Sequence, residues 1–128
     1  MDKSVATLKT FMAILYAGCF YTLVDPSFPP ERIRQILDVL DTELVITLPE
    51  HHEKLTSTGY SGAILYVDEL DYTGKLQTAQ ATLQKLRKNL ADTDPVYCNF
   101  TSGSTGVPKG VLVCHRSVID FIGQFTET

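Results

Sequence analysis

The stretch VYCNFTSGSTGVPKGVLVC occupies residues 96–114, and it places a loop rich in glycine and hydroxyl side chains between two strand-like runs. Val96–Thr101 alternates as a strand does, and Val111–Cys114 is a short β-branched and apolar run. No helical period follows Lys109. We therefore expect two consecutive antiparallel strands joined by the loop Ser102–Lys109.

Helical and strand patterns alternate on the N-terminal side of this hairpin. Over Val5–Tyr16, four apolar residues recur at helical spacing and predict one buried stripe, formed by Leu8, Phe11, Met12 and Leu15. The β-branched and aromatic run Phe20–Val24 predicts a strand that a proline turn ends. A second helix is predicted to start at Pro29-Pro30 and to run to Leu40.

The middle and the end of the chain continue this alternation. Leu44–Thr47 and Ala63–Val67 predict strands, and the polar, glycine-rich stretch Pro49–Gly62 between them predicts a surface loop. A third helix is predicted over Ala79–Leu90 and a closing helix near Ser117–Phe125. Strands separated by helices favour a parallel or mixed sheet flanked by helices, so the predicted fold class is α/β.

Charge and cysteine content exclude several classes of function. The net charge is −4 and the chain has no long run of like charges, so we expect no nucleic-acid partner. Its three cysteines form no metal-binding spacing, which indicates reduced, buried thiols and a cytoplasmic protein. The N-terminal apolar run is well short of the roughly 20 residues that span a bilayer, so we expect no membrane partner.

The loop within Thr101–Gly110 combines the residue types that bind phosphate. Gly103 and Gly106 can adopt positive φ and let backbone N–H groups approach an anion closely. Hydroxyl side chains add donors, and Lys109 adds a compact positive charge. The predicted phosphate-binding residues are Thr101, Ser102, Gly103, Ser104, Thr105, Gly106 and Lys109.

This loop differs from the common phosphate-binding motifs. The P-loop pattern GxxxxGK[ST] would need glycine at Pro108 and a hydroxyl residue at Gly110. A strand is expected after Lys109, so no helix N-terminus is aimed at the phosphates. Binding must depend on the loop itself.

The ten-residue segment TSGSTGVPKG resembles, residue for residue, the phosphate-loop signature of the adenylate-forming (AMP-binding) superfamily. This superfamily comprises acyl-CoA synthetases, luciferases and peptide-synthetase adenylation domains. A second block, made of Ala13–Gly18, Tyr21–Pro29 and Glu31–Ile33, resembles the helix-strand-turn block upstream of that loop. The resemblance covers nearly the whole chain. It is closest to amino-acid adenylation domains of nonribosomal peptide synthetases and D-alanyl carrier protein ligases.

Two positions depart from that pattern. Cys19 stands where the family has a second glycine, and Thr22-Leu23 stands where it has a residue followed by proline. Neither position is expected to touch phosphate. Asp25 is expected to cap the turn after the strand and not to take part in catalysis.

The resemblance implies ATP-dependent activation of a carboxylic acid, with an amino acid as first choice. An acyl-adenylate forms, pyrophosphate leaves with Mg²⁺ assistance, and the acyl group passes to the phosphopantetheine thiol of a carrier protein. Two alternatives stay open, an acyl-CoA synthetase and a non-catalytic truncated copy. The pattern does not identify the acid.

The chain is far shorter than a superfamily member. Residues 1–128 are therefore expected to be a partial AMP-binding (adenylation) domain, truncated at both ends and inactive alone. We assign no catalytic residue and no metal ligand within it, because the adenine, acid and Mg²⁺ sites of the family would lie beyond Thr128.

Other polar residues carry weaker signals. His51 and His52 have no third ligand at metal-binding spacing, so a solvated loop is the expected explanation. His115 either lies near the nucleotide or begins the final helix. An acidic cluster of Asp68, Glu69 and Asp71 is expected to be a solvated edge.

Overall fold

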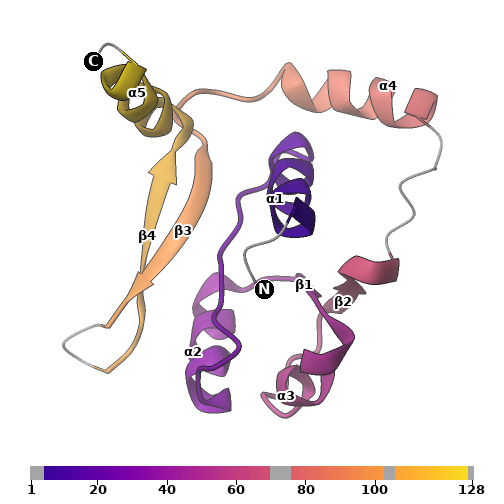
Figure 1. Cartoon of the computed structure of the whole chain (residues 1–128), viewed down its shortest axis with the longest axis vertical. Coiled ribbons are helices and arrows are strands. Elements are labelled where there is room, and N and C mark those ends of the chain that lie inside the picture. The colour runs from indigo at the N-terminus through magenta and orange to yellow at the C-terminus, as the bar shows by residue number, and fades with distance from the viewer. Residues whose placement is uncertain (1–4, 70–75, 103–105, 127–128) are drawn as a thin grey trace.

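The structure, a computed structural model, describes residues 5–69, 76–102 and 106–126 (Figure 1). It is of the α/β class, as predicted. In chain order its helices and strands are α1 (Val5–Tyr16), α2 (Pro30–Leu40), β1 (Leu44–Thr47), η1 (Pro49–His51), α3 (His52–Thr56), β2 (Ala63–Tyr66), η2 (Val67–Glu69), α4 (Leu76–Arg87), β3 (Pro95–Thr101), β4 (Lys109–Cys114) and α5 (His115–Thr126).

The strands of the described residues form two small sheets. β1 and β2 pair in parallel, with Val45 opposite Ile64. β3 and β4 pair antiparallel, with Thr101 opposite Lys109 at the end that leads into the loop. The predicted antiparallel hairpin is therefore confirmed, and the predicted parallel or mixed sheet is present as one parallel and one antiparallel pair.

The strand predicted over Phe20–Val24 is wrong, because this segment makes only one isolated parallel bridge, between Tyr21 and Tyr97. The Tyr21 N–H donates to the Val96 carbonyl at 3.2 Å, and the Cys98 N–H donates to the Tyr21 carbonyl at 2.9 Å. Among the described residues these two hydrogen bonds with β3 are the only backbone pairing of the segment, so a continuous ladder does not form.

The core lies between α2 and α3. Ile33 and Leu37 of α2 and Leu55 of α3 are buried against one another, and Val45 and Ile64 of the parallel sheet pack on them. This cluster follows from the predicted apolar stripe of α2. The helix starts with Pro30 in its first turn, as predicted, and ends where Asp41 adopts a left-handed φ of 48°.

The stretch Pro49–Gly62 is not the plain surface loop predicted from its composition. It contains η1 and α3, and Leu55 is only 7% exposed. The Thr58 hydroxyl donates to the Leu55 carbonyl at 2.6 Å and ends the helix. Burial of the large apolar side chain of Leu55 overrides the turn-forming tendency of its polar neighbours.

The predicted buried stripe of α1 is also wrong. Leu8 and Met12 are 63% and 53% exposed, whereas Thr7 and Thr10 are buried. The Phe11 ring stacks on the Tyr21 ring at a centroid distance of 4.2 Å, which turns the neighbouring threonine face inward. The Thr10 hydroxyl is satisfied by the Ala6 carbonyl at 2.9 Å, so burying it leaves no unpaired polar group.

The three cysteines differ in exposure. Cys98 is buried and Cys114 is half-buried, but Cys19 is exposed, which corrects the prediction that all three are buried. All three are free thiols, as predicted. Within the described ranges, no helix has the length and apolar content to cross a membrane.

Candidate functional site

The β3–β4 hairpin holds the predicted phosphate loop at its tip, at the end of the hairpin farthest from α5 (Figure 1). Thr101 ends β3 and Lys109 begins β4, so the hairpin brings these two predicted site residues opposite each other. The Thr101 hydroxyl lies 3.5 Å from the Lys109 carbonyl, which it approaches as a donor. Gly103, Ser104 and Thr105 lie outside the described residues.

The described part of the loop is open to solvent. Thr101, Ser102, Gly106 and Lys109 are exposed, whereas Pro108 is buried. Gly106 has a φ of +79°, as its predicted role requires, and no atom lies within 4 Å of the position of an added Cβ. Among the described residues, no ion pair involves Lys109. These donors are therefore accessible to an anion.

Gly110 has a structural role that the sequence analysis missed. It lies in β4 opposite Phe100, and a Cβ at this position would lie 2.8 Å from the Cys98 sulfur and 3.3 Å from Phe100 Cζ. Close approach of the two strands therefore requires glycine here. The sequence does contain a signal for this role, because a glycine directly before the β-branched run Val111–Cys114 indicates close approach of a neighbouring strand.

Substituting Gly110 with alanine is expected to destabilise the hairpin by about 1–3 kcal/mol, because the added methyl group overpacks a filled space. Gly123→Ala in α5 is the matched control, since nothing lies within 4 Å of its added Cβ and alanine favours the helix. Urea unfolding measures both. Equal stability of Gly110→Ala and the parent would contradict the steric role.

The end of the hairpin opposite the loop is fixed to the chain that precedes it. The Arg116 guanidinium makes two hydrogen bonds of 2.9 Å with the Asp92 carboxylate, and the His115 N–H donates to the Asp94 carbonyl at 3.1 Å. His115 thus begins α5, one of the two roles left open for it. A six-residue strand separates it from the loop by about 20 Å.

Cys114 is a second residue that sequence reasoning missed. It lies just before α5, and its sulfur lies 3.3 Å from the Ser117 hydroxyl. Hydrogen bonds from the side chain and the backbone of Ser117 lower the pKa of the Cys114 thiol. The signal in the sequence is a cysteine three residues before a serine at a helix start.

Because its pKa is lowered, Cys114 is expected to react with iodoacetamide at a lower pH than an ordinary cysteine. The thiolate is the reactive form, so the reaction rate rises as pH passes upward through the pKa. Ser117→Ala removes one donor to the thiolate, which should raise the pH midpoint. Peptide mass spectrometry over a pH series measures this, and an unchanged midpoint would contradict the assignment.

The remaining predicted polar groups have local roles. The Tyr66 hydroxyl and His52 Nδ1 are 2.5 Å apart, and His51 lies 3.5 Å from the Glu50 carboxylate. His51 ends η1 and His52 begins α3, so neither histidine lies in the loop that the sequence predicted. In the parts of the chain that the structure describes, no His, Cys, Asp and Glu side chains gather as a metal site.

The acidic residues also have simple settings. Asp68 and Glu69 are exposed, as predicted, and Asp71 lies outside the described residues. Asp25 caps its turn as predicted: its carboxylate accepts from the Ser27 N–H at 2.8 Å. That backbone hydrogen bond lowers the pKa of Asp25.

Solved structures share this fold. A fatty acyl-adenylate ligase from L. pneumophila superposes with a TM-score of 0.68 at 19% identity, over 96% of this chain and 21% of that chain. The nonribosomal peptide synthetase FmoA3, solved with α-methyl-L-serine-AMP bound, gives a TM-score of 0.71 at 24% identity, over 95% of this chain and 12% of that chain.

Sequence comparisons agree with the fold. The chain is 38% identical to tyrocidine synthase 3 of Brevibacillus parabrevis over 130 residues, which cover all of this chain and 2% of that protein. It is 35% identical to the N-(5-amino-5-carboxypentanoyl)-L-cysteinyl-D-valine synthase of Amycolatopsis lactamdurans, over 98% of this chain and 3% of that protein. A family model described as "AMP-binding enzyme" matches residues 1–128. The chain therefore belongs to the AMP-binding enzyme family.

Proposed function

We propose that the protein containing this chain activates an amino acid with ATP, forms an aminoacyl-adenylate and transfers the aminoacyl group to the thiol of a carrier protein. This chain contributes the loop that binds the β- and γ-phosphates of ATP. The observation that carries the proposal is the exposed loop of the β3–β4 hairpin, with Thr101 and Lys109 opposite each other at its base.

The described loop residues fit a triphosphate. Lys109 supplies a full positive charge, and the hydroxyl groups of Thr101 and Ser102 supply neutral donors. Gly106 leaves open space beside the backbone, where an anion can approach closely. Gly103, Ser104 and Thr105 extend the same donor set in the proposal.

The chemistry needs this charge at one step. A carboxylate oxygen of the acid attacks the α-phosphorus, the bond between the α-phosphorus and the bridging oxygen breaks, and pyrophosphate leaves with the electron pair. Negative charge builds up on the departing group. Fixed donors and a cation around the β- and γ-phosphates stabilise it without a proton transfer.

Mg²⁺ is expected to arrive with the nucleotide. It commonly binds through substrate phosphates and only one or two carboxylates. The described residues offer no cluster of carboxylates for it. No residue of this chain is therefore assigned as its ligand.

The choice of an amino acid and a carrier thiol is supported by the sequence relatives, because the relative at 35% identity is by name the synthase of an L-cysteinyl-D-valine compound and the relative at 38% identity is a tyrocidine synthase. The likeness to the fatty acyl-adenylate ligase is at 19% identity and concerns the fold alone. The chain spans only 2–3% of these two relatives, so the activity belongs to the protein that contains it.

The test is ATP–pyrophosphate exchange by that protein with a panel of amino acids, fatty acids and aryl acids. Exchange stimulated by one or a few amino acids is expected. A second assay offers coenzyme A or a phosphopantetheinylated carrier as acceptor. Stimulation only by fatty or aryl acids, with coenzyme A as acceptor, would identify an acyl-CoA synthetase, and no exchange with any acid would support a non-catalytic protein.

A further inference from the structure

Asn99 of β3 has an unusual setting for its residue type. Asparagine is depleted in β-strands, because its side chain competes with the strand ladder for backbone hydrogen bonds. Asn99 nevertheless lies inside β3, two residues before Thr101, and is exposed. No hydrogen bond joins its side-chain amide to another residue of the described ranges. The two N–H donors of this amide are therefore accessible to a ligand.

The hairpin register places Asn99 on the same face as the two residues that flank the phosphate loop. Side chains two residues apart on a strand point to the same side, and directly opposite residues share a face. Thr101 lies opposite Lys109 and Asn99 lies opposite Val111, so these four side chains share one face of β3–β4. Asn99 is thus the next polar side chain of β3 on this face, with its Cα about 6.8 Å from that of Thr101.

A crevice of about 560 Å³ opens beside Asn99. Tyr21 makes a parallel bridge to β3, so Phe20–Val24 and β3 run in the same direction and their carboxyl ends lie at the same edge. The crevice is lined on one side by Asn99 and on the other by Val24 and Asp25. In α/β folds, ligands bind in crevices at the carboxyl ends of parallel strands.

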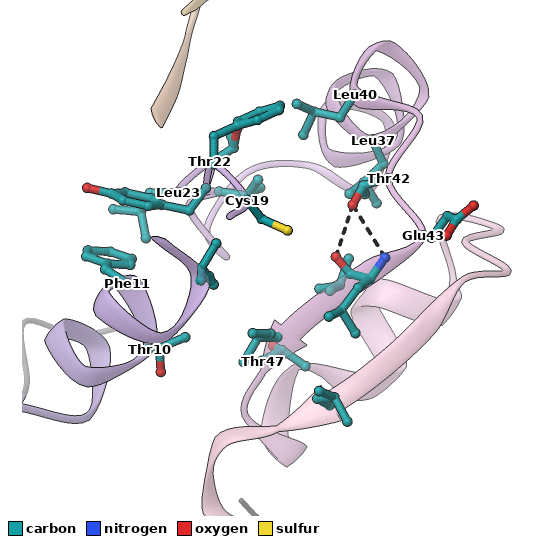
Figure 2. Close-up of a pocket in the computed structure, with 18 of the residues that line it drawn as sticks. Thr10, Phe11, Cys19, Thr22, Leu23, Leu37, Leu40, Thr42, Glu43 and Thr47 are labelled. Atoms are coloured by element: carbon teal, nitrogen blue, oxygen red, sulfur yellow. Dashed lines mark hydrogen bonds between the residues drawn. The ribbon is translucent and has the colours of Figure 1, made fainter. Parts of the chain in front are cut away.

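A larger cleft, of about 890 Å³, lies between Phe20–Val24 and β1 (Figure 2). Its lining is mostly apolar, and none of its described lining residues belongs to the β3–β4 hairpin. It therefore adds no donor to the phosphate loop. The crevice beside Asn99 is the one that continues the binding face of the hairpin.

The charges at the two ends of this face differ, and they determine which phosphate group of ATP lies beside Asn99. The crevice contains the Asp25 carboxylate, and the hydrogen bond from the Ser27 N–H lowers its pKa, so it is negatively charged at neutral pH. Lys109 supplies a positive charge at the loop end. The γ-phosphate carries the most negative charge and is favoured near Lys109, away from Asp25. The α-phosphate carries a single negative charge, so it suits the Asn99 end.

We propose that Asn99 is a further substrate-binding residue for adenylation and that its amide donates a hydrogen bond to the α-phosphate of ATP. This assignment rests on the proposed function, in which the loop binds the β- and γ-phosphates. When the carboxylate attacks, the bond from the α-phosphorus to the bridging oxygen breaks, and pyrophosphate leaves with the electron pair. The α-phosphate remains in the adenylate. Asn99 therefore holds the group that stays, whereas Lys109 holds the group that leaves.

Two ligands that each carry only part of ATP separate these roles. AMP retains the α-phosphate, and inorganic pyrophosphate stands for the β- and γ-phosphates. Isothermal titration calorimetry of each ligand with the protein that contains this chain measures both affinities. Asn99→Ala is expected to weaken AMP binding roughly tenfold, the typical effect of one hydrogen bond to a charged group, and to change pyrophosphate binding by less than about twofold. Lys109→Ala is expected to show the reverse pattern.

Two further variants control for size and for position. Asn99→Asp keeps the size of the side chain but replaces its N–H donors with a carboxylate. It is expected to weaken AMP binding more than Asn99→Ala does, because charge repulsion adds to the lost hydrogen bond. Asn89→Ala is the matched control, since Asn89 is an exposed asparagine outside the hairpin, in the turn after α4. It should bind both ligands as the parent does.

The outcomes distinguish this assignment from the proposed function. Parent-like AMP binding by both Asn99 variants would show that the amide contacts no phosphate. Weakened pyrophosphate binding with unchanged AMP binding would place a different phosphate beside Asn99, and equal weakening of both ligands with a lower melting temperature would show a structural role. Each of these results overturns the assignment alone. A parent protein that binds neither AMP nor ATP would contradict the proposed function, and the assignment with it.

Discussion

Replacing Lys109 with alanine in the protein that contains this chain is expected to slow ATP-dependent pyrophosphate exchange roughly ten- to a hundredfold at subsaturating ATP. A hydrogen bond to a charged group contributes about 1.5–3 kcal/mol, and each 1.4 kcal/mol is a factor of ten. Lys109 is exposed and in no ion pair with a described residue, so its side chain is available to phosphate. Exchange is the right measurement because it reports adenylation without a thiol acceptor.

Two controls sharpen this experiment. Lys85→Ala removes an exposed lysine from α4, outside the hairpin, and should leave the exchange rate unchanged. The melting temperature of Lys109→Ala should match that of the parent, since no described contact of the side chain is lost. An exchange rate equal to that of the parent would show that Lys109 does not bind phosphate.

The sequence predicted the hairpin because each signal there is local. Alternating apolar and polar residues predict β3, the glycines predict the loop, and the β-branched run predicts β4. The two antiparallel strands and their connection therefore follow from short-range sequence patterns. Asp25 as a turn cap and the α2 stripe follow in the same way. The positive φ of Gly106 is likewise a property of the loop itself.

The predictions that were wrong or missing concern burial and packing that depend on distant parts of the chain. Periodicity predicts that α1 is helical, but the Phe11–Tyr21 stack decides which face of it is covered. Similarly, Phe20–Val24 has the composition of a strand, but it forms only one isolated bridge to β3, at Tyr21, and local composition does not determine whether a partner strand runs alongside. The steric demand on Gly110 comes from the Cys98 side chain on the partner strand, which a single-strand pattern does not contain.

The hairpin geometry brings together two of the predicted site residues. Thr101 and Lys109 are brought together because they flank one hairpin turn, which the spacing alone implied. His115 was left with two possible roles because the length and direction of β4 decide how far it lies from the loop. Because β4 is a six-residue strand, its two ends are far apart. His115 therefore lies at the start of α5 and away from the loop.

The isolated 128-residue chain is expected to self-associate. α5 has no buried residue and exposes a row of large apolar side chains, with Ile122 at 55% and Phe125 at 69%. On α1, Leu8 and Met12 are also exposed. Large apolar side chains gathered on an exposed helix face mark a surface that another surface covers. Sedimentation velocity should therefore detect species larger than the 14.2 kDa monomer, in amounts that grow with concentration.

A double variant, Ile122→Lys with Phe125→Lys, tests whether α5 is the surface responsible. It is expected to shift the chain to the monomer while leaving the helical circular dichroism unchanged, because both positions are exposed. Asp120→Lys is the matched control, since it changes the net charge by the same amount at an exposed polar position of the same helix. The control should still self-associate. Equal monomerisation by Asp120→Lys would attribute the effect to charge repulsion and not to the apolar face, and a monomeric parent chain would contradict the prediction outright.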